Sequence, residues 1–377
     1  MKVLPAPALR KRNKLNVIRN IFDHKMMSRA QIARITNLSL STLSYIIREL
    51  EQENLVCSEE ILQGRGRPSQ VVKINPSGWS VIGIKIGREE VRGTLFDAAM
   101  KPLKNHGVRV FSYLRNNDGY VQAFTDVLEH LLCDNLLGVG ICSSGIVEGG
   151  KIVVSHLMNV NDLDFGKLLQ KDYQIKRFTL MNDTDALCYA LPKAERSDFL
   201  LITYGTGIGA SFWTKGQAQH FEIGHAIVSS DGRCYCGQTG CLEYHASEYA
   251  VLKSYTNREI DFEDFARNEE EKYREIIEKV RSLAAKDFHI VETHYRKSLQ
   301  MLGMIVGNLL MVLKPSTVFL LGEGMVNEQM ARFLKEYIKG RFNREFVNDI
   351  SFLIAKADWE QGVATATVHK FLHELVK

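Results

Sequence analysis

Apolar side chains recur at helical spacing three times near the start of the chain, over residues 14–22, 29–36 and 42–55. A serine precedes the second segment, and Ser39 or Ser41 precedes the third, where a hydroxyl can cap the first turn of a helix. The pattern therefore predicts three short helices, of which the last two are joined by a tight turn. Such an arrangement is typical of a helix-turn-helix.

The exposed start of the third predicted helix is rich in short polar side chains. Side chains of this kind can approach phosphates and base edges closely, so we expect this segment to contact DNA. The residues of this predicted contact surface are Ser39, Ser41, Thr42, Ser44, Tyr45 and Arg48.

Residues 55–74 alternate between apolar and polar positions around a glycine-rich turn, which predicts a two-stranded wing after the three helices. The turn contains Arg65, Gly66, Arg67 and Pro68. Two guanidinium groups on such a turn suit the narrow minor groove of A·T-rich DNA, and a solvated basic hairpin is the alternative. We therefore add Arg65 and Arg67 to the predicted DNA contacts.

The charge of the chain is unevenly distributed along its length. Residues 1–73 hold 13 Lys and Arg against 6 Asp and Glu, a net of +7, whereas the whole chain has a net of only +4. The remaining residues are therefore mildly acidic. This asymmetry predicts that only the first unit meets a polyanion such as double-stranded DNA.

A turn cluster at residues 75–78 separates the two units, so we expect a DNA-binding domain over residues 1–74 and a second domain over residues 78–377. In the second region apolar strands end in glycine-rich or polar loops, and helical segments fall between several of the strands. This alternation predicts an α/β domain whose binding sites lie at strand ends. The expected helical segments lie around residues 119–132, 186–194 and 274–313.

Composition bears on the cellular compartment. The chain is 45% hydrophobic and 24% charged, which is the profile of a soluble globular protein. The N-terminus lacks the apolar core of a signal peptide, and the apolar run 299–313 is too short and too interrupted to span a bilayer, so it predicts a core helix or a dimer contact. Four of the seven cysteines are scattered singly, which argues against a disulfide framework. We expect a cytoplasmic protein without membrane contact.

Two strand-end loops carry candidate chemistry. The segment 204–210, Tyr-Gly-Thr-Gly-Ile-Gly-Ala, has backbone N–H groups that could cradle a phosphate. Asn182 and Asp183 end another apolar strand before a predicted helix. The Asp183 carboxylate could take a proton from a sugar hydroxyl as a general base, or could simply cap the helix.

Three cysteines and a histidine form the most specific motif of the chain. Cys234 and Cys236 make a C-x-C pair, Cys241 follows five residues later, and His225 lies nine residues before the pair. One imidazole and three thiolates are a closed tetrahedral set that is typical of structural zinc. A disulfide within C-x-C is strained and no C-x-x-C spacing is present, so zinc is favoured over a redox site, with a metal-free reduced turn as the other alternative.

The segment from Glu222 to Ser247, EIGHAIVSSDGRCYCGQTGCLEYHAS, resembles the zinc motif of the ROK family of sugar kinases and sugar-responsive repressors. The resemblance covers essentially the whole chain, and it implies an α/β fold with an N-terminal winged helix-turn-helix and a two-lobed, actin-like ATPase (ribonuclease H-like) domain. The implied ligands of a structural Zn²⁺ are His225, Cys234, Cys236 and Cys241. The implied sugar-binding set is Asn182, Asp183, Glu222, His225 and Glu243. Asp183 matches the catalytic base of the kinases, and residues 203–209 resemble their second phosphate loop.

The chain departs from the kinase pattern where the nucleotide would bind. The first phosphate loop of the kinases, D-x-G-G-T, falls at residues 85–89, where Lys85 replaces the aspartate and Gly87, Arg88 and Glu89 replace G-G-T. A cation and a bulky side chain there oppose the binding of metal-bound phosphates. Two further departures are Glu323 in a loop that is usually G-G-G and Phe221 at a position that is usually glycine. We therefore expect no catalytic residue, and we interpret Asp183 as the vestige of a base.

Together these inferences predict a sugar-responsive transcriptional repressor, similar to the xylose, N-acetylglucosamine and glucose types. It would bind an operator as a homodimer, or as a dimer of dimers, and respond to a sugar or sugar derivative in a kinase-like pocket. Two alternatives stay open: an ATP-dependent sugar kinase with an added DNA-binding module, and an adaptor that binds another protein through its large domain. The residues specify neither the sugar nor the operator sequence.

Overall fold

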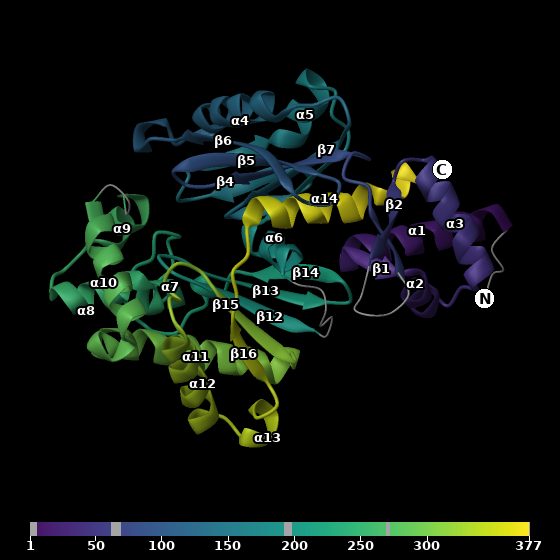
Figure 1. Ribbon diagram of the computed structural model, residues 1–377. Coiled ribbons are helices and arrows are strands. Elements are labelled where there is room, and N and C mark those ends of the chain that lie inside the picture. The colour runs from purple at the N-terminus through teal and green to yellow at the C-terminus, as the bar shows by residue number, and fades with distance from the viewer. Residues whose placement is uncertain (1–5, 62–68, 192–197, 269–271, 377) are drawn as a thin grey trace.

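The computed structural model describes residues 6–61, 69–191, 198–268 and 272–376 (Figure 1). A small N-terminal domain lies against one end of a larger domain of two lobes, and the C-terminal helix α14 (Trp359–Leu375) runs between these parts.

The N-terminal domain is a winged helix-turn-helix, as the sequence predicts. Its three strands form an antiparallel sheet in the order β1-β3-β2. Helix α3 buries an apolar face that belongs to the same core cluster as the buried side chains of α1. The elements are α1 (Ala6–His24), β1 (Met26–Ser28), α2 (Arg29–Thr36), α3 (Leu40–Gln52), β2 (Val56–Ile61) and β3 (Ser69–Ile74).

Local side-chain chemistry sets the ends of these helices. Ser28 caps α2 in a capping box, in which the backbone N–H of Ser28 donates to the Gln31 side chain at 2.8 Å. Asn37 ends α2 in the left-handed conformation, with φ of 56°. Ser39, rather than Ser41, caps α3, because its hydroxyl accepts from the backbone N–H of Thr42 at 3.2 Å. The end of α2 at Asn37 and the cap of α3 at Ser39 therefore fix the turn of the helix-turn-helix.

Lobe I is built on a five-stranded sheet in the order β11-β7-β4-β5-β6. Strands β4, β7 and β11 are parallel, so their carboxyl ends lie at the same edge, where Lys85 is in register with Cys142 and Ser143 with Asn182. The strands are β4 (Ser80–Ile86), β5 (Glu90–Asp97), β6 (Pro102–Arg109), β7 (Leu136–Ser143) and β11 (Phe178–Asn182). A second, small sheet and two helices complete the lobe: β8 (Ile146–Glu148), β9 (Lys151–Ser155), β10 (Val160–Asp164), α4 (Asn117–Leu131) and α5 (Phe165–Asp172).

Lobe II has a second five-stranded sheet, in the order β14-β13-β12-β15-β16, and helix α6 (Asp183–Ala190) leads into it from lobe I. Its strands are β12 (Phe199–Tyr204), β13 (Ile208–Thr214), β14 (Gln217–Phe221), β15 (Thr317–Leu321) and β16 (Ser351–Ile354). Its helices are α7 (Leu242–Ala246), α8 (Glu248–Thr256), α9 (Phe262–Asn268), α10 (Arg274–Lys286), α11 (Glu292–Leu313), α12 (Glu328–Arg341) and α13 (Arg344–Val347).

The apolar run 299–313 lies in α11, and the single helical segment expected over residues 274–313 is divided between α10 and α11. Leu299, Leu302 and Val306 are buried in the core of lobe II, so this run is a core helix. Among the described residues, no helix is both long enough and apolar enough to cross a membrane.

The winged domain and lobe I share one hydrophobic core through α14. One buried cluster contains Ile18 of α1, Val81 of β4, and Val368 and Leu372 of α14. The other face of the lobe I sheet forms a separate cluster with α4, to which Ile82 belongs. The winged domain is therefore packed directly against lobe I.

Candidate functional site

Four side chains that commonly ligate metals lie together between β14 and α7. The ligand atoms of His225, Cys234, Cys236 and Cys241 all lie within 4.8 Å of one another. The Nδ1 atom of His225 is 3.7 Å from Cys234 Sγ, and Cys236 Sγ is 3.7 Å from Cys241 Sγ. A tetrahedron with zinc–sulfur bonds of about 2.3 Å has edges of about 3.8 Å, so the cluster could hold a metal ion.

The backbone of this loop depends on glycine at one close contact. Gly240 has φ of 85°, and a Cβ atom there would lie 1.8 Å from the carbonyl oxygen of Ser229. The tight turn brings Cys241 back toward the other ligands. Burial raises the pKa of the Cys241 thiol to about 11, so this thiol stays protonated unless a cation lies beside it.

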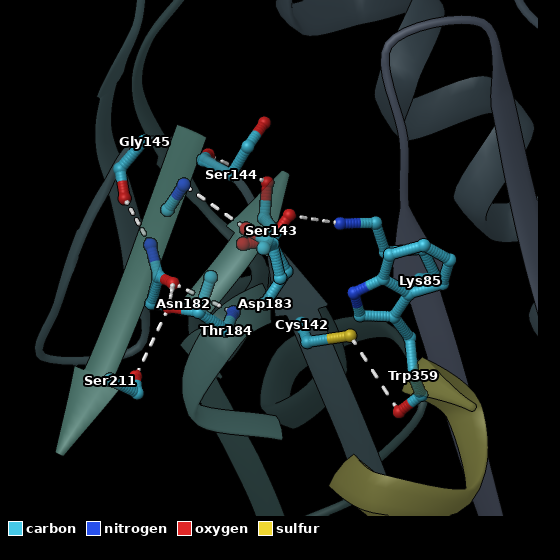
Figure 2. Close-up of polar contacts among 12 residues, drawn as sticks. Lys85, Cys142, Ser143, Ser144, Gly145, Asn182, Asp183, Thr184, Ser211 and Trp359 are labelled. Atoms are coloured by element: carbon cyan, nitrogen blue, oxygen red, sulfur yellow. Dashed lines mark hydrogen bonds and ion pairs between the residues drawn. The ribbon is translucent and has the colours of Figure 1, made fainter. Parts of the chain in front are cut away.

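Lys85, Asn182 and Asp183 meet at the edge of lobe I where the parallel strands end (Figure 2). Asn182, rather than Asp183, caps α6: its Oδ1 accepts from the backbone N–H of Thr184 at 2.9 Å and from the Thr184 hydroxyl at 2.7 Å. The Asn182 amide nitrogen donates to the carbonyl oxygen of Gly145 at 3.1 Å. The amide is thus held by the protein, and its contact with a sugar stays a prediction.

Asp183 forms an ion pair with Lys85, and both side chains are largely buried, at 19% and 14% exposure. The Lys85 ammonium also lies 5.1 Å from the centroid of the Trp359 ring. The Asp183 carboxylate, which matches the catalytic base of the kinases, is therefore engaged by a cation of the chain itself.

Arg88 and Arg115 connect the two lobes. The Arg88 guanidinium, which follows β4 in lobe I, donates to the carbonyl oxygen of Ala266 in α9 of lobe II. Arg115 is 8% exposed and donates to the carbonyl oxygen of Arg267 in the same helix. Cations are favourable at carbonyls near the end of a helix, so these two bonds hold the lobes together in this conformation.

Glu243 is a buried carboxylate of lobe II. Its Oε2 accepts from the backbone N–H of Ile208 at 2.9 Å, and its Oε1 accepts from the Tyr235 hydroxyl. Burial raises the pKa of Glu243. The side chain ties the glycine-rich loop after β12 to the loop of the cysteine cluster. Glu222, by contrast, is 49% exposed and is accessible to a ligand.

His220 and Asp185 are two polar residues beside this site that the sequence analysis did not identify. His220 Nδ1 lies 3.5 Å from Asp185 Oδ2, and its Nε2 lies 3.9 Å from Glu222 Oε1. The hydrogen bond to Asp185 raises the pKa of His220. His220 belongs to β14 and Asp185 to α6, so no local pattern could have paired them.

An arginine side chain pairs with Glu323, the residue in the loop after β15 that departs from the kinase pattern. Glu323 lies 2.7 Å from a guanidinium nitrogen of Arg281, which also pairs with the buried Glu248 at 2.6 Å. Phe221, the second residue that departs from the kinase pattern, ends β14 and lies opposite Ala210 of β13 in the antiparallel register.

The predicted DNA-contact surface begins with a connected group of hydroxyls. Ser39 Oγ lies 3.0 Å from Ser41 Oγ and 2.8 Å from Thr42 Oγ1. All three residues are exposed at the start of α3. Hydroxyls in this position are available to phosphate oxygens.

The later residues of the same helix differ in their availability. The Ser44 hydroxyl donates to the carbonyl oxygen of Leu40 at 2.8 Å, and Arg48 is exposed. Tyr45 is 51% exposed, and its hydroxyl accepts from Arg10 at 2.8 Å. Arg65 and Arg67 of the predicted wing lie outside the described residues.

Known proteins resemble both parts of the chain. The xylose repressor of Bacillus subtilis (strain 168) is 27% identical over 283 residues, which cover 69% of this chain and 72% of the repressor. The crystal structure of a ROK family transcriptional regulator, described as a homolog of the E. coli MLC protein, has a TM-score of 0.75 at 20% identity and covers 98% of both chains. A ROK family glucokinase from Streptomyces griseus, in complex with glucose and AMPPNP, has a TM-score of 0.59 at 18% identity over 76% of this chain and 98% of its own.

These structural likenesses confirm the fold, a winged helix-turn-helix followed by the two-lobed, actin-like fold of the sugar kinases. A family model described as winged helix-turn-helix DNA-binding matches residues 10–56. A second model, described as the ROK family, matches residues 81–368, which span both lobes of the large domain and include the cysteine cluster. The predicted resemblance is confirmed, and the chain belongs to the ROK family.

Proposed function

We propose that the chain is a transcriptional repressor that binds operator DNA through residues 1–74 and a sugar or sugar derivative through residues 78–377. The observation that carries the proposal is the hydrophobic core that the winged domain shares with lobe I of a sugar-kinase fold. This shared core couples lobe I to the DNA-binding helix. In the same lobe, Lys85 forms an ion pair with Asp183. The ion pair opposes phosphotransfer, which we propose is lost.

The proposed sugar pocket uses carboxylates and an imidazole from both lobes. Glu222 is the most accessible of these groups, and its carboxylate can accept from vicinal sugar hydroxyls. Asp183 supplies a second acceptor, whose position is fixed by Lys85. His225 has its Nδ1 toward Cys234, which leaves its Nε2 for a hydroxyl. The remaining members of the proposed set are Asn182 and Glu243.

We further propose that His225, Cys234, Cys236 and Cys241 hold a structural zinc ion. All four ligand atoms lie within 4.8 Å of one another, and two of their separations are 3.7 Å, close to the edge of a tetrahedral zinc site. When bound, zinc supplies no reaction step and fixes the loop that carries His225. Because Tyr235 in this loop donates to Glu243, loss of the metal would also disturb the buried carboxylate.

The coupling between ligand and DNA requires a difference in ligand affinity between two arrangements of the lobes. A sugar that contacts Asp183 in lobe I and Glu222 in lobe II favours one separation of the lobes. The bonds of Arg88 and Arg115 to α9 favour the separation seen here. A ligand that changes this separation must break or rearrange those bonds, and the winged domain follows lobe I.

We propose a cytoplasmic homodimer, or a dimer of dimers, because a helix-turn-helix dimer binds two half-sites related by two-fold symmetry. This arrangement predicts a roughly palindromic operator. The proposed compartment follows from the cysteines that are scattered singly along the sequence, which favour a reducing environment.

The test of this function is fluorescence anisotropy on labelled DNA from upstream of the gene and its neighbours, titrated with free sugars at fixed salt. We expect tight, specific binding that one sugar changes. Glu222→Gln should weaken the response to that sugar at least about tenfold while the affinity for DNA without sugar is kept. Glu336→Gln, an exposed change on α12, is the matched control. Weak, salt-sensitive binding that no sugar alters would contradict the proposal.

A further inference from the structure

A polar cavity of about 630 Å³ lies where the winged domain meets the large domain. Its wall combines α1 of the winged domain, the turn between β13 and β14 of lobe II, and parts of β11 and α14 of lobe I. Figure 1 shows α1 beside α14 and the ends of β13 and β14. None of the residues of the proposed sugar set or of the cysteine cluster is among the described residues that line it.

The charge of the lining is predominantly positive. Arg19, Lys215 and Lys370 contribute three cations from three different elements. Asp23 is the only acidic residue of the described lining, and its carboxylate lies 3.2 Å from His369 Nε2. Within the part of the chain that the structure describes, neither Arg19 nor Lys215 has a carboxylate partner. Three exposed cations against one carboxylate give the lining a net positive charge, which attracts an anion.

The lining also offers hydrogen-bonding groups that suit an oxygen-rich ligand. Thr179 of β11 is 8% exposed, and among the described residues its hydroxyl has no hydrogen-bond partner. A buried hydroxyl without a partner is unfavourable, so a ligand or water beside it gains a bond. The side-chain amides of Asn16 and Gln217 add donors and acceptors from α1 and β14.

We propose that this cavity is a second effector site, which binds a small phosphate-bearing metabolite. A phosphate group supplies several strong acceptor oxygens for the three cations, and the volume lies within the range of small-molecule pockets. Such a ligand bridges α1 to lobe II across the domain junction. It therefore stabilises one placement of the DNA-binding unit by a route that is separate from the sugar set. Met181 also lines the cavity and precedes Asn182 in β11, so the two sites share a strand.

Isothermal titration of the full-length protein with a hexose monophosphate, inorganic phosphate and the free hexose tests this site. We expect saturable binding of the hexose monophosphate. Lys215→Asn and Arg19→Gln should each weaken it at least about tenfold, because each removes one charge-assisted contact. Asparagine tolerates the left-handed backbone of Lys215, whose φ is 52°, and glutamine preserves the helix at Arg19. Lys171→Gln, at an exposed position of α5, is the control and should bind as the wild type does.

Tighter binding of the hexose monophosphate than of either inorganic phosphate or the free hexose would support a metabolite site. Absence of saturable binding by the phosphate compounds up to about 10 mM would overturn the proposal. So would binding that survives both Lys215→Asn and Arg19→Gln but is lost in Glu222→Gln, since that result places the ligand at the sugar set. Failure of the repressor function appears separately, as absent operator binding in the anisotropy assay.

Discussion

Replacement of Lys85 by methionine tests whether the ion pair with Asp183 holds the end of the lobe I sheet. Methionine keeps the length and the apolar stem of the side chain and removes its charge. The Asp183 carboxylate would then lose its cation in a position where it is only 19% exposed. We therefore expect Lys85→Met to destabilise the protein, and Asp183→Asn to do so for the converse reason.

The magnitude follows from the burial of the two side chains. Removal of one partner from a fully buried ion pair costs about 3–5 kcal/mol of unfolding free energy. Lys85 and Asp183 retain 14% and 19% exposure, so hydration of the orphaned charge lowers the expected cost to about 2–3 kcal/mol for each single change. The double variant leaves no orphaned charge. Its loss of unfolding free energy should therefore be at least about 2 kcal/mol smaller than the sum of the losses in the two single variants.

The assay is urea unfolding of the four proteins, followed by tryptophan fluorescence and far-UV circular dichroism. Trp359 is a useful probe because its ring lies beside the Lys85 ammonium. Lys176→Met, at an exposed position before β11, is the control and should stay within about 0.5 kcal/mol of the wild type. If the two single costs add within about 0.5 kcal/mol in the double variant, the ion pair does not have the role assigned to it.

Three further predictions concern metal, pH and DNA. Cys236→Ser should lose most of the bound zinc in metal analysis, whereas His130→Ala should keep it, because His130 belongs to a separate, partly exposed group with His106 and Asp126. The hydrogen bond that His220 donates to Asp185 raises the pKa of His220 above 6.5, so the stabilisation from this pair is fully present below about pH 6.5 and is lost as pH rises through the folded-state pKa. The thermal midpoint of unfolding should therefore depend less on pH in this range in His220→Gln than in the wild type. Arg48→Ala should weaken operator binding by about 1–3 kcal/mol if Arg48 contacts a base. If Arg48 contacts only a phosphate, the change should reduce the slope of log affinity against log salt concentration by about one.

Each of these predictions has a result that contradicts it. Full zinc content in Cys236→Ser would show that the ligand set is wrong. A pH profile of His220→Gln with the wild-type slope would remove the role of the pair with Asp185. Unchanged affinity and unchanged salt dependence in Arg48→Ala would exclude this exposed arginine from the DNA contact.

Much of the winged domain could be predicted from the sequence because its determinants are local. A helix cap needs a serine a few residues from its partner, and Ser28 and Ser39 both satisfy that condition. The grouping of His225, Cys234, Cys236 and Cys241 was predictable for a similar reason, since these residues lie close together in the sequence. The choice between Ser39 and Ser41 as the cap of α3 still required the backbone conformation.

The sequence by itself therefore determined the local elements, the family resemblance and the residue types of the proposed sites. Only the tertiary structure decided how distant groups are paired. It assigned the cap of α6 to Asn182, placed Lys85 against Asp183, and joined the lobes through Arg88 and the carbonyl of Ala266, 178 residues away in the chain. The physical reason is that partners in such pairs are chosen by strand register and by the packing of α14 between domains, and neither leaves a periodic signal along the chain.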